Sequence, residues 1–145
     1  MSLVLDEHRQ YLSDQNRLDA YSRAIEELVK PGSVVVDLGA GTGIMGLLAC
    51  RAGASRVYCV EETSLIGLAS DLFQANGFAD RVMFIKDFST HISLPERADV
   101  VIADQIGRFG FEAGNQVLRT VALMLRHAVR PFDTVARWGG EEFVV

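Results

Sequence analysis

A glycine-rich stretch and an acidic residue downstream of it are the first groups in the sequence that could bind a ligand. Asp37 comes after an apolar run and is the first residue of the segment DLGAGTG, residues 37–43. Glycines let a ligand approach the backbone closely, and the start of a helix offers free N–H groups. Glu61 comes eighteen residues after Gly43, near the interval at which an acid accepts hydrogen bonds from ribose hydroxyls. The pattern predicts a nucleoside-binding corner; the alternative is a nonspecific strand–turn–helix corner with a solvated acid. The candidate ligands here are Asp37, Gly39, Ala40, Gly41, Gly43 and Glu61.

These residues fall at the ends of predicted strands, within an alternation of strands and helices. Residues 33–38 are a β-branched run, which is typical of a strand buried on both faces. Helical spacing of apolar residues predicts one helix within residues 1–30, which Pro31-Gly32 ends. Because strands that alternate with helices imply right-handed crossovers, we expect an α/β fold with a mainly parallel sheet and flanking helices. The further predicted elements are helices over 44–51, 64–76 and 115–129, strands over 56–60, 82–85 and 98–103, and a hairpin of 134–138 with 142–145 around Gly139-Gly140. In this hairpin we expect 134–138 to extend the edge of the sheet beside the fourth strand and 142–145 to fold back on it.

Composition and charge narrow the class of protein. The 145 residues suit a single domain, and 49% hydrophobic with 23% charged residues is ordinary for a globular chain. The net charge of −5 argues against a nucleic-acid partner and is compatible with a small ligand or a basic protein substrate. No signal peptide opens the sequence and no apolar run is long enough to span a bilayer, so we expect a cytoplasmic protein without a membrane partner. Cys50 and Cys59 fit buried, reduced thiols, and we expect no metal site.

The segment VVVDLGAGTGIMGLLACRAGASRVYCVEE, residues 34–62, resembles the S-adenosylmethionine (SAM) site of class I methyltransferases. It is closely similar to the protein arginine methyltransferase branch, and the resemblance covers about residues 11–107. It implies a Rossmann-like methyltransferase core with SAM as cofactor. Asp37 and the glycine loop would then hold the methionine end of SAM, and Glu61 the ribose.

Two further stretches extend the resemblance to the rest of the cofactor. YLSDQNRLDAY resembles a helix whose arginine pairs with the SAM carboxylate, here Arg17, and a bidentate guanidinium fits a carboxylate. The alternative for Arg17 is a solvated helix residue. In the segment KDF, Asp87 and Phe88 stand where related enzymes contact adenine, by a hydrogen bond and by packing. The alternative for Phe88 is a core position.

The segment ADQIGRFGFEAG, residues 103–114, bears on catalysis. In the arginine branch, the loop after the fourth strand supplies two glutamates that grip the substrate guanidinium. Asp104 stands at the first of these positions, while Glu112 is one residue short of the second, which strict counting places at Ala113. Paired carboxylates fit a cation, so Asp104 and Glu112 are the candidate catalytic residues. The alternative is that Asp104 caps a turn.

Residues from about 109 to 145 resemble a different family. FGFEAGNQVLRTVALMLRHAVRPFDTVARWGGEEFVV is similar to the middle of a GGDEF diguanylate cyclase domain, with GGEEF at 139–143. Arg130 and Asp133 form the R-x-x-D pair that resembles an inhibitory cyclic di-GMP site. Phe111 and Asn115 replace a histidine and an acid of that family, and its earlier half is missing. We therefore expect neither cyclase activity nor cyclic di-GMP as a partner.

Together these patterns predict two segments within one domain. Residues 1–108 would be the SAM-binding core, and 109–145 a partial GGDEF-like helix and hairpin packed as part of the same domain, with a junction near 109–114. The predicted function is methyl transfer from SAM to a protein, arginine among the candidate acceptors, or to a small-molecule nucleophile. Two alternatives stay open. The chain could be a chimeric or truncated protein without activity, or a partial diguanylate cyclase module that binds cyclic di-GMP.

Overall fold

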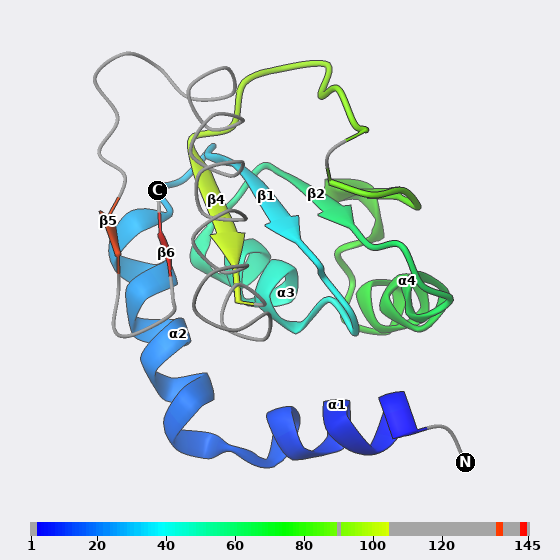
Figure 1. The fold of residues 1–145 in the computed structure, drawn as a ribbon. Coiled ribbons are helices and arrows are strands. Elements are labelled where there is room, and N and C mark those ends of the chain that lie inside the picture. Colours follow the sequence, from blue (N-terminus) through cyan, green and yellow to red (C-terminus); the bar gives the residue numbers. More distant parts are fainter. Residues whose placement is uncertain (1–2, 90, 105–135, 138–142, 145) are drawn as a thin grey trace.

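The centre of the molecule is a six-stranded sheet whose strand order is β3-β2-β1-β4-β6-β5 (Figure 1). The computed structural model describes residues 3–89, 91–104, 136–137 and 143–144. β1 pairs in parallel with both β2 and β4, and β2 pairs in parallel with β3. The parallel sheet with flanking helices confirms the predicted α/β fold. The described strands are β1 (Val34–Leu38), β2 (Arg56–Val60), β3 (Val82–Ile85), β4 (Val100–Ala103), β5 (Ala136–Arg137) and β6 (Phe143–Val144).

The N-terminal segment forms two helices where the apolar spacing predicted one. α1 (Leu3–Ser13) ends just before Asp14, and α2 (Gln15–Leu28) begins just after it. The Asp14 carboxylate accepts a hydrogen bond from the backbone N–H of Arg17 at 3.1 Å. An aspartate that caps N–H groups in this way starts a new helix, so the continuous helix predicted for this stretch is wrong at Asp14. The remaining described helices are α3 (Ile44–Ala52), α4 (Leu65–Ala75) and a short 3₁₀ turn at Ala79–Arg81.

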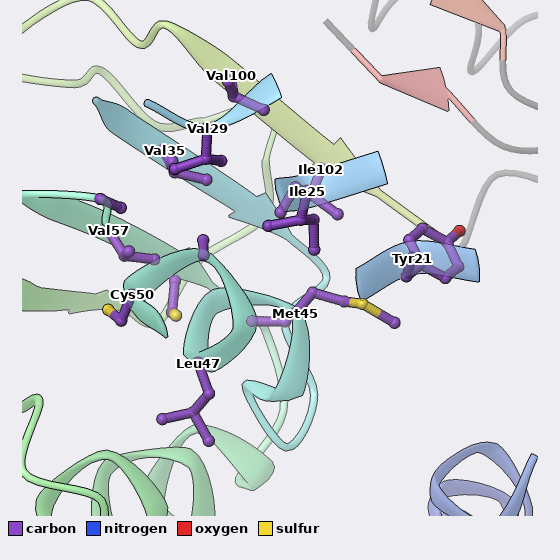
Figure 2. Close-up of a cluster of buried hydrophobic side chains, with 14 of the residues drawn as sticks. Tyr21, Ile25, Val29, Val35, Met45, Leu47, Cys50, Val57, Val100 and Ile102 are labelled. Carbon is purple, nitrogen blue, oxygen red and sulfur yellow. The ribbon is translucent and has the colours of Figure 1, made fainter. Parts of the chain in front are cut away.

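Both faces of β1, β2 and β4 are buried, as the β-branched run of residues 33–38 predicted for the first strand. On one face, α2 and α3 pack against alternate strand residues such as Val35 and Val57 (Figure 2). On the other, Val36 and Tyr58 lie with Val101 against the partly buried Ile92 and Leu94. The side chains labelled in Figure 2 are Tyr21, Ile25, Val29, Val35, Met45, Leu47, Cys50, Val57, Val100 and Ile102.

The two cysteines are free and buried, as predicted. Burial raises the pKa of the Cys50 thiol to about 11, and it raises the pKa of the Cys59 thiol further. Both groups therefore stay protonated near neutral pH and behave as small apolar side chains.

The C-terminal strands pair as a hairpin, but their order on the sheet differs from the prediction. Arg137 pairs with Phe143, and Phe143 pairs with Ala103, so β6 lies beside β4 and β5 forms the outer edge. We expected the segment 134–138 to lie beside the fourth strand. The observed order puts the apolar strand inside and the strand with an arginine at the edge, where charged residues discourage further pairing. The predicted helix over 115–129, the Gly139-Gly140 turn and the junction near 109–114 lie outside the described residues.

Within the part of the chain that the structure describes, no helix is both long enough and apolar enough to cross a membrane.

Candidate cofactor-binding site

The predicted ligand residues meet at the carboxyl ends of the parallel strands. Asp37 is the second-last residue of β1, Glu61 follows β2 directly, and Asp104 follows β4 directly. The strand order reverses at β1, which has β2 on one side and β4 on the other. Open α/β sheets bind ligands at such a switch point. In Figure 1, α1 runs past this same end of β1 and β4.

The glycine loop needs its glycines for backbone conformation and for space. Gly39, Gly41 and Gly43 have φ values of 67°, 54° and 78°, a left-handed region that other residues rarely adopt. A methyl group on Gly41 would overlap the imidazole of His8 from α1. A methyl group on Gly43 would lie 3.0 Å from the Phe73 ring, so α4 also packs closely on the loop. The loop is therefore enclosed between α1 and α4.

Glu61 holds the loop to the end of β2. Its side chain is buried, and its Oε2 accepts a hydrogen bond from the N–H of Gly41 at 2.8 Å. Its Oε1 accepts another from the N–H of Thr63 at 2.9 Å. Each carboxylate oxygen can accept a second hydrogen bond, so a ligand diol could still donate to Glu61. The structure thus gives this residue a role in shaping the loop; its contact with ribose stays a prediction.

Asp37 is a buried acid in an acidic setting. Its Oδ2 accepts a hydrogen bond from the N–H of Gly46 at 2.9 Å, and the residue is only 3% exposed. Burial, followed by the nearby Asp104 carboxyl, raises the pKa of Asp37 to about 7. The Gly46 hydrogen bond opposes this shift, and Glu61 adds to it. The carboxyl group therefore titrates near neutral pH instead of staying ionised.

Arg17 and Asp104, which the resemblance assigns to cofactor and to substrate, are ion-paired with each other. Arg17 Nη2 donates to Asp104 Oδ2, and their side chains are 18% and 14% exposed. The guanidinium also lies 4.7 Å from the ring centroid of Tyr11 and 5.4 Å from that of Tyr21. Burial raises the pKa of Asp104. The positive charge of Arg17 opposes this shift, and His8 opposes it too. Arg17 is therefore not a solvated helix residue.

A cavity that is open to solvent lies over the glycine loop. Its lining contains the predicted residues Arg17, Asp37, Gly39, Ala40 and Asp104, and in addition His8, Tyr11, Leu12, Thr42, Ile44 and Met45. We had not predicted His8 and Tyr11 as site residues. In the sequence, the spacing of His8, Tyr11 and Leu12 already places the three residues on one side of a helix. That spacing could have indicated that His8 and Tyr11 face the same site.

The predicted adenine-contacting residues lie at the same sheet edge but not in the lining of this cavity. β3 pairs with β2, and the N–H of Glu61 donates to the carbonyl of Ile85 at 3.0 Å, so Asp87 follows one strand over. Asp87 Oδ1 accepts the N–H of Phe88 at 2.7 Å and lies 3.4 Å from His91 Nδ1. Phe88 is 56% exposed, so the alternative that it is a core residue is wrong. Glu112 lies outside the described residues.

Among the residues that the structure describes, no cluster of three or more His, Cys, Asp or Glu side chains could hold a metal ion.

Two family models match the chain. One, described as ribosomal protein L11 methyltransferase (PrmA), matches residues 22–121. The other, described as diguanylate cyclase, GGDEF domain, matches residues 104–145. The overlap of the two matches includes the predicted junction near 109–114.

The curated relatives include plant protein arginine methyltransferases. The protein arginine N-methyltransferase PRMT10 of Oryza sativa subsp. japonica is 38% identical over 103 residues, which are 70% of this chain and 27% of that protein. The Arabidopsis thaliana PRMT10 is 39% identical over 100 residues, which are 68% of this chain and 26% of that protein. The chain thus spans about a quarter of the length of these relatives.

Solved structures of protein arginine methyltransferases also align with this chain. Arabidopsis thaliana protein arginine methyltransferase 10, in an open conformation, aligns with a TM-score of 0.76 and 32% identity over 88% of this chain and 36% of its own. The Trypanosoma brucei PRMT1 enzyme–prozyme complex with AdoHcy aligns with a TM-score of 0.62 and 31% identity over 65% of this chain and 30% of its own. From the methyltransferase family match, these relatives and the shared fold, we conclude that the chain belongs to the class I S-adenosylmethionine-dependent methyltransferases and resembles their protein arginine methyltransferase branch.

Proposed function

We propose that this chain binds SAM in the cavity over the glycine loop and transfers its methyl group to a protein, with arginine as the acceptor residue. The observation that carries the proposal is the composition of the cavity lining. Arg17, Asp37 and the glycine loop line one cavity at the switch point of the sheet. The relatives are named as arginine methyltransferases, and one structural neighbour contains AdoHcy.

The lining supplies a partner for each charged group of the amino-acid end of SAM. The Arg17 guanidinium would hold the carboxylate, since it offers paired N–H donors. Asp37 would face the ammonium group. Glu61, one strand over, would accept hydrogen bonds from the ribose hydroxyls, and Asp87 and Phe88 would contact adenine. The site thus follows the carboxyl edge of the sheet from β4 through β1 and β2 to β3.

Methyl transfer requires alignment more than covalent chemistry from the protein. When bound, SAM supplies a methyl group on a sulfonium, and the acceptor nitrogen displaces the sulfur and loses a proton. Asp104, which lines the cavity, would hold a cationic acceptor, with Glu112 as the second candidate. Tyr11 and Leu12 of α1 line the cavity and would limit the entry of water around a bound ligand. A small-molecule nucleophile is the alternative acceptor.

We also propose a cytoplasmic location, which the free thiols of Cys50 and Cys59 support.

Calorimetry with SAM and S-adenosylhomocysteine tests the binding step. We expect both ligands to bind the wild-type chain, and Arg17→Ala to weaken binding at least tenfold. Arg23→Ala is the matched control, because Arg23 lies exposed on the same helix and donates to the backbone of Asp19. Absence of binding at millimolar ligand, with the protein folded, would overturn the proposal.

An assay with methyl-labelled SAM tests turnover. A histone mixture is the natural acceptor to try, because some relatives are named histone-arginine methyltransferases. Label in arginine supports the proposed acceptor, and label in other residues or small molecules would contradict it.

A second candidate function rests on the GGDEF match to residues 104–145. Arg130 and Asp133, the pair that would bind cyclic di-GMP, lie outside the described residues. A titration with cyclic di-GMP separates the two functions: we expect no binding, and binding that Arg130→Ala abolishes would favour the second candidate. A third interpretation, a chimera without activity, predicts a melting temperature that neither ligand changes.

A further inference from the structure

Three carboxyl groups surround the glycine loop at the carboxyl edge of the sheet. Asp37 of β1 stands opposite Cys59 of β2 and Ile102 of β4. Two residues beyond these partners, Glu61 and Asp104 follow the ends of their own strands. The strand register therefore brings three acids from three neighbouring strands to one place.

The basic side chains around the glycine loop already contact other residues. Among the described residues that line the cavity, the basic side chains are those of Arg17 and His8. The Arg17 guanidinium is paired with Asp104, and His8 lies beside Gly41, where it also acts on Asp104 and lowers the pKa of that carboxyl. Among the described residues, Asp37 forms no ion pair.

The other groups around Asp37 do not compensate its charge. From α3, the Gly46 N–H donates a hydrogen bond to one carboxyl oxygen. From β2, the neighbouring side chains are the Cys59 thiol, whose pKa is raised by burial, and the Glu61 carboxylate. From β4 comes the acid Asp104, from α2 the paired Arg17, and from α1 His8. A buried acid beside other acids, without a cation of its own, favours its neutral form.

We propose that the ligand-free protein holds a proton on Asp37 in solution and that binding of SAM releases this proton to solvent. The inference rests on the proposed function. The SAM carboxylate would pair with Arg17, which is already shared with Asp104. SAM would also bring an ammonium group and a sulfonium to the loop, beside Asp37. Their charge favours the ionised carboxylate, so the O–H bond of Asp37 breaks, the proton passes to the buffer, and no other bond changes. The pocket thereby prefers a cationic ligand at the loop.

Calorimetry in two buffers tests this step directly. SAM is titrated into the wild-type protein at pH 6.0 in phosphate and in Bis-Tris, two buffers that work at this pH and whose ionisation enthalpies differ. The amine of SAM is protonated at this pH, so it does not contribute. We expect the binding enthalpy to differ between the buffers, in the sense and size of nearly one released proton per site. Equal enthalpies in the two buffers, with SAM bound, would overturn the proposal.

Two variants locate the proton. Asp37→Asn should bind SAM more weakly and without the buffer dependence, because an amide can neither pair with the ammonium group nor ionise, whereas Asp71→Asn, on the exposed face of α4, should keep both. Buffer dependence retained in Asp37→Asn would also overturn the proposal. If Asp37→Asn fails to bind, the carboxyl-carbon NMR signal of Asp37 decides. It should titrate near neutral pH in the free protein and not in the SAM complex. If SAM does not bind folded wild-type protein at all, the proposed function itself has failed.

Discussion

The stability of the ligand-free protein should depend on pH through Asp37. The pKa of Asp37 is raised from 3.8 to about 7 in the folded protein, so the folded state holds a proton that the unfolded chain has lost. A group with a raised folded pKa stabilises the fold below its unfolded pKa, and this contribution is lost as the pH rises through the folded value. Each pKa unit corresponds to about 1.36 kcal/mol, and about two units lie between pH 5 and the folded pKa. We therefore expect the wild-type free energy of unfolding to fall by about 3 kcal/mol from pH 5 to pH 8 through this one residue.

Urea denaturation followed by circular dichroism measures this loss. Asp37→Asn replaces the acid by an amide of nearly the same shape, so the variant should lack the fall of about 3 kcal/mol while keeping the pH dependence of other groups. Asp71→Asn, an exposed acid on α4, should follow the wild-type profile. The free energies of unfolding are compared only between proteins with the same m-value, because equal m-values indicate that unfolding exposes the same amount of surface. If Asp37→Asn loses as much stability as the wild type between pH 5 and 8, the placement of a buried proton on Asp37 is refuted.

Other residues of the site give three further expectations, each measured by denaturation and by calorimetry with SAM. Gly41→Ala should cost about 1–2 kcal/mol, because its φ of 54° strains an alanine, and should weaken SAM binding, whereas Gly67→Ala, in open space on α4, should not destabilise. Glu61→Gln should cost about 2 kcal/mol, because one of two backbone N–H donors loses its acceptor; Glu62→Gln, exposed beside it, should be neutral. Arg17→Ala should cost about 3 kcal/mol by leaving its buried carboxylate partner unpaired, and an unchanged stability would contradict the ion pair.

The strands and the glycine corner could be predicted from local sequence. The predicted strands over 56–60 and 82–85 coincide with β2 and β3, because short β-branched runs flanked by turn residues have little alternative. The helix starts after Gly43 and ends before Gly53, and both glycines adopt left-handed φ values at its ends. These features depend on nearest neighbours along the chain, so sequence patterns capture them.

Contacts between distant segments could not be predicted in this way. Arg17 and Asp104 are 87 residues apart, and nothing in either segment indicates that they pair. His8 covers Gly41 only because Asp14 breaks the N-terminal helix and redirects α1 towards the cavity. Likewise, the hairpin was predictable from its turn, whereas the choice of β6 as the strand beside β4 depends on sheet packing.

The most direct measurement is a crystal structure of the chain with SAM bound. The account predicts density for the ligand in the cavity over residues 39–43, with its carboxylate on Arg17 and its ribose hydroxyls on Glu61. Density at another place, or a ribose turned away from Glu61, would contradict it.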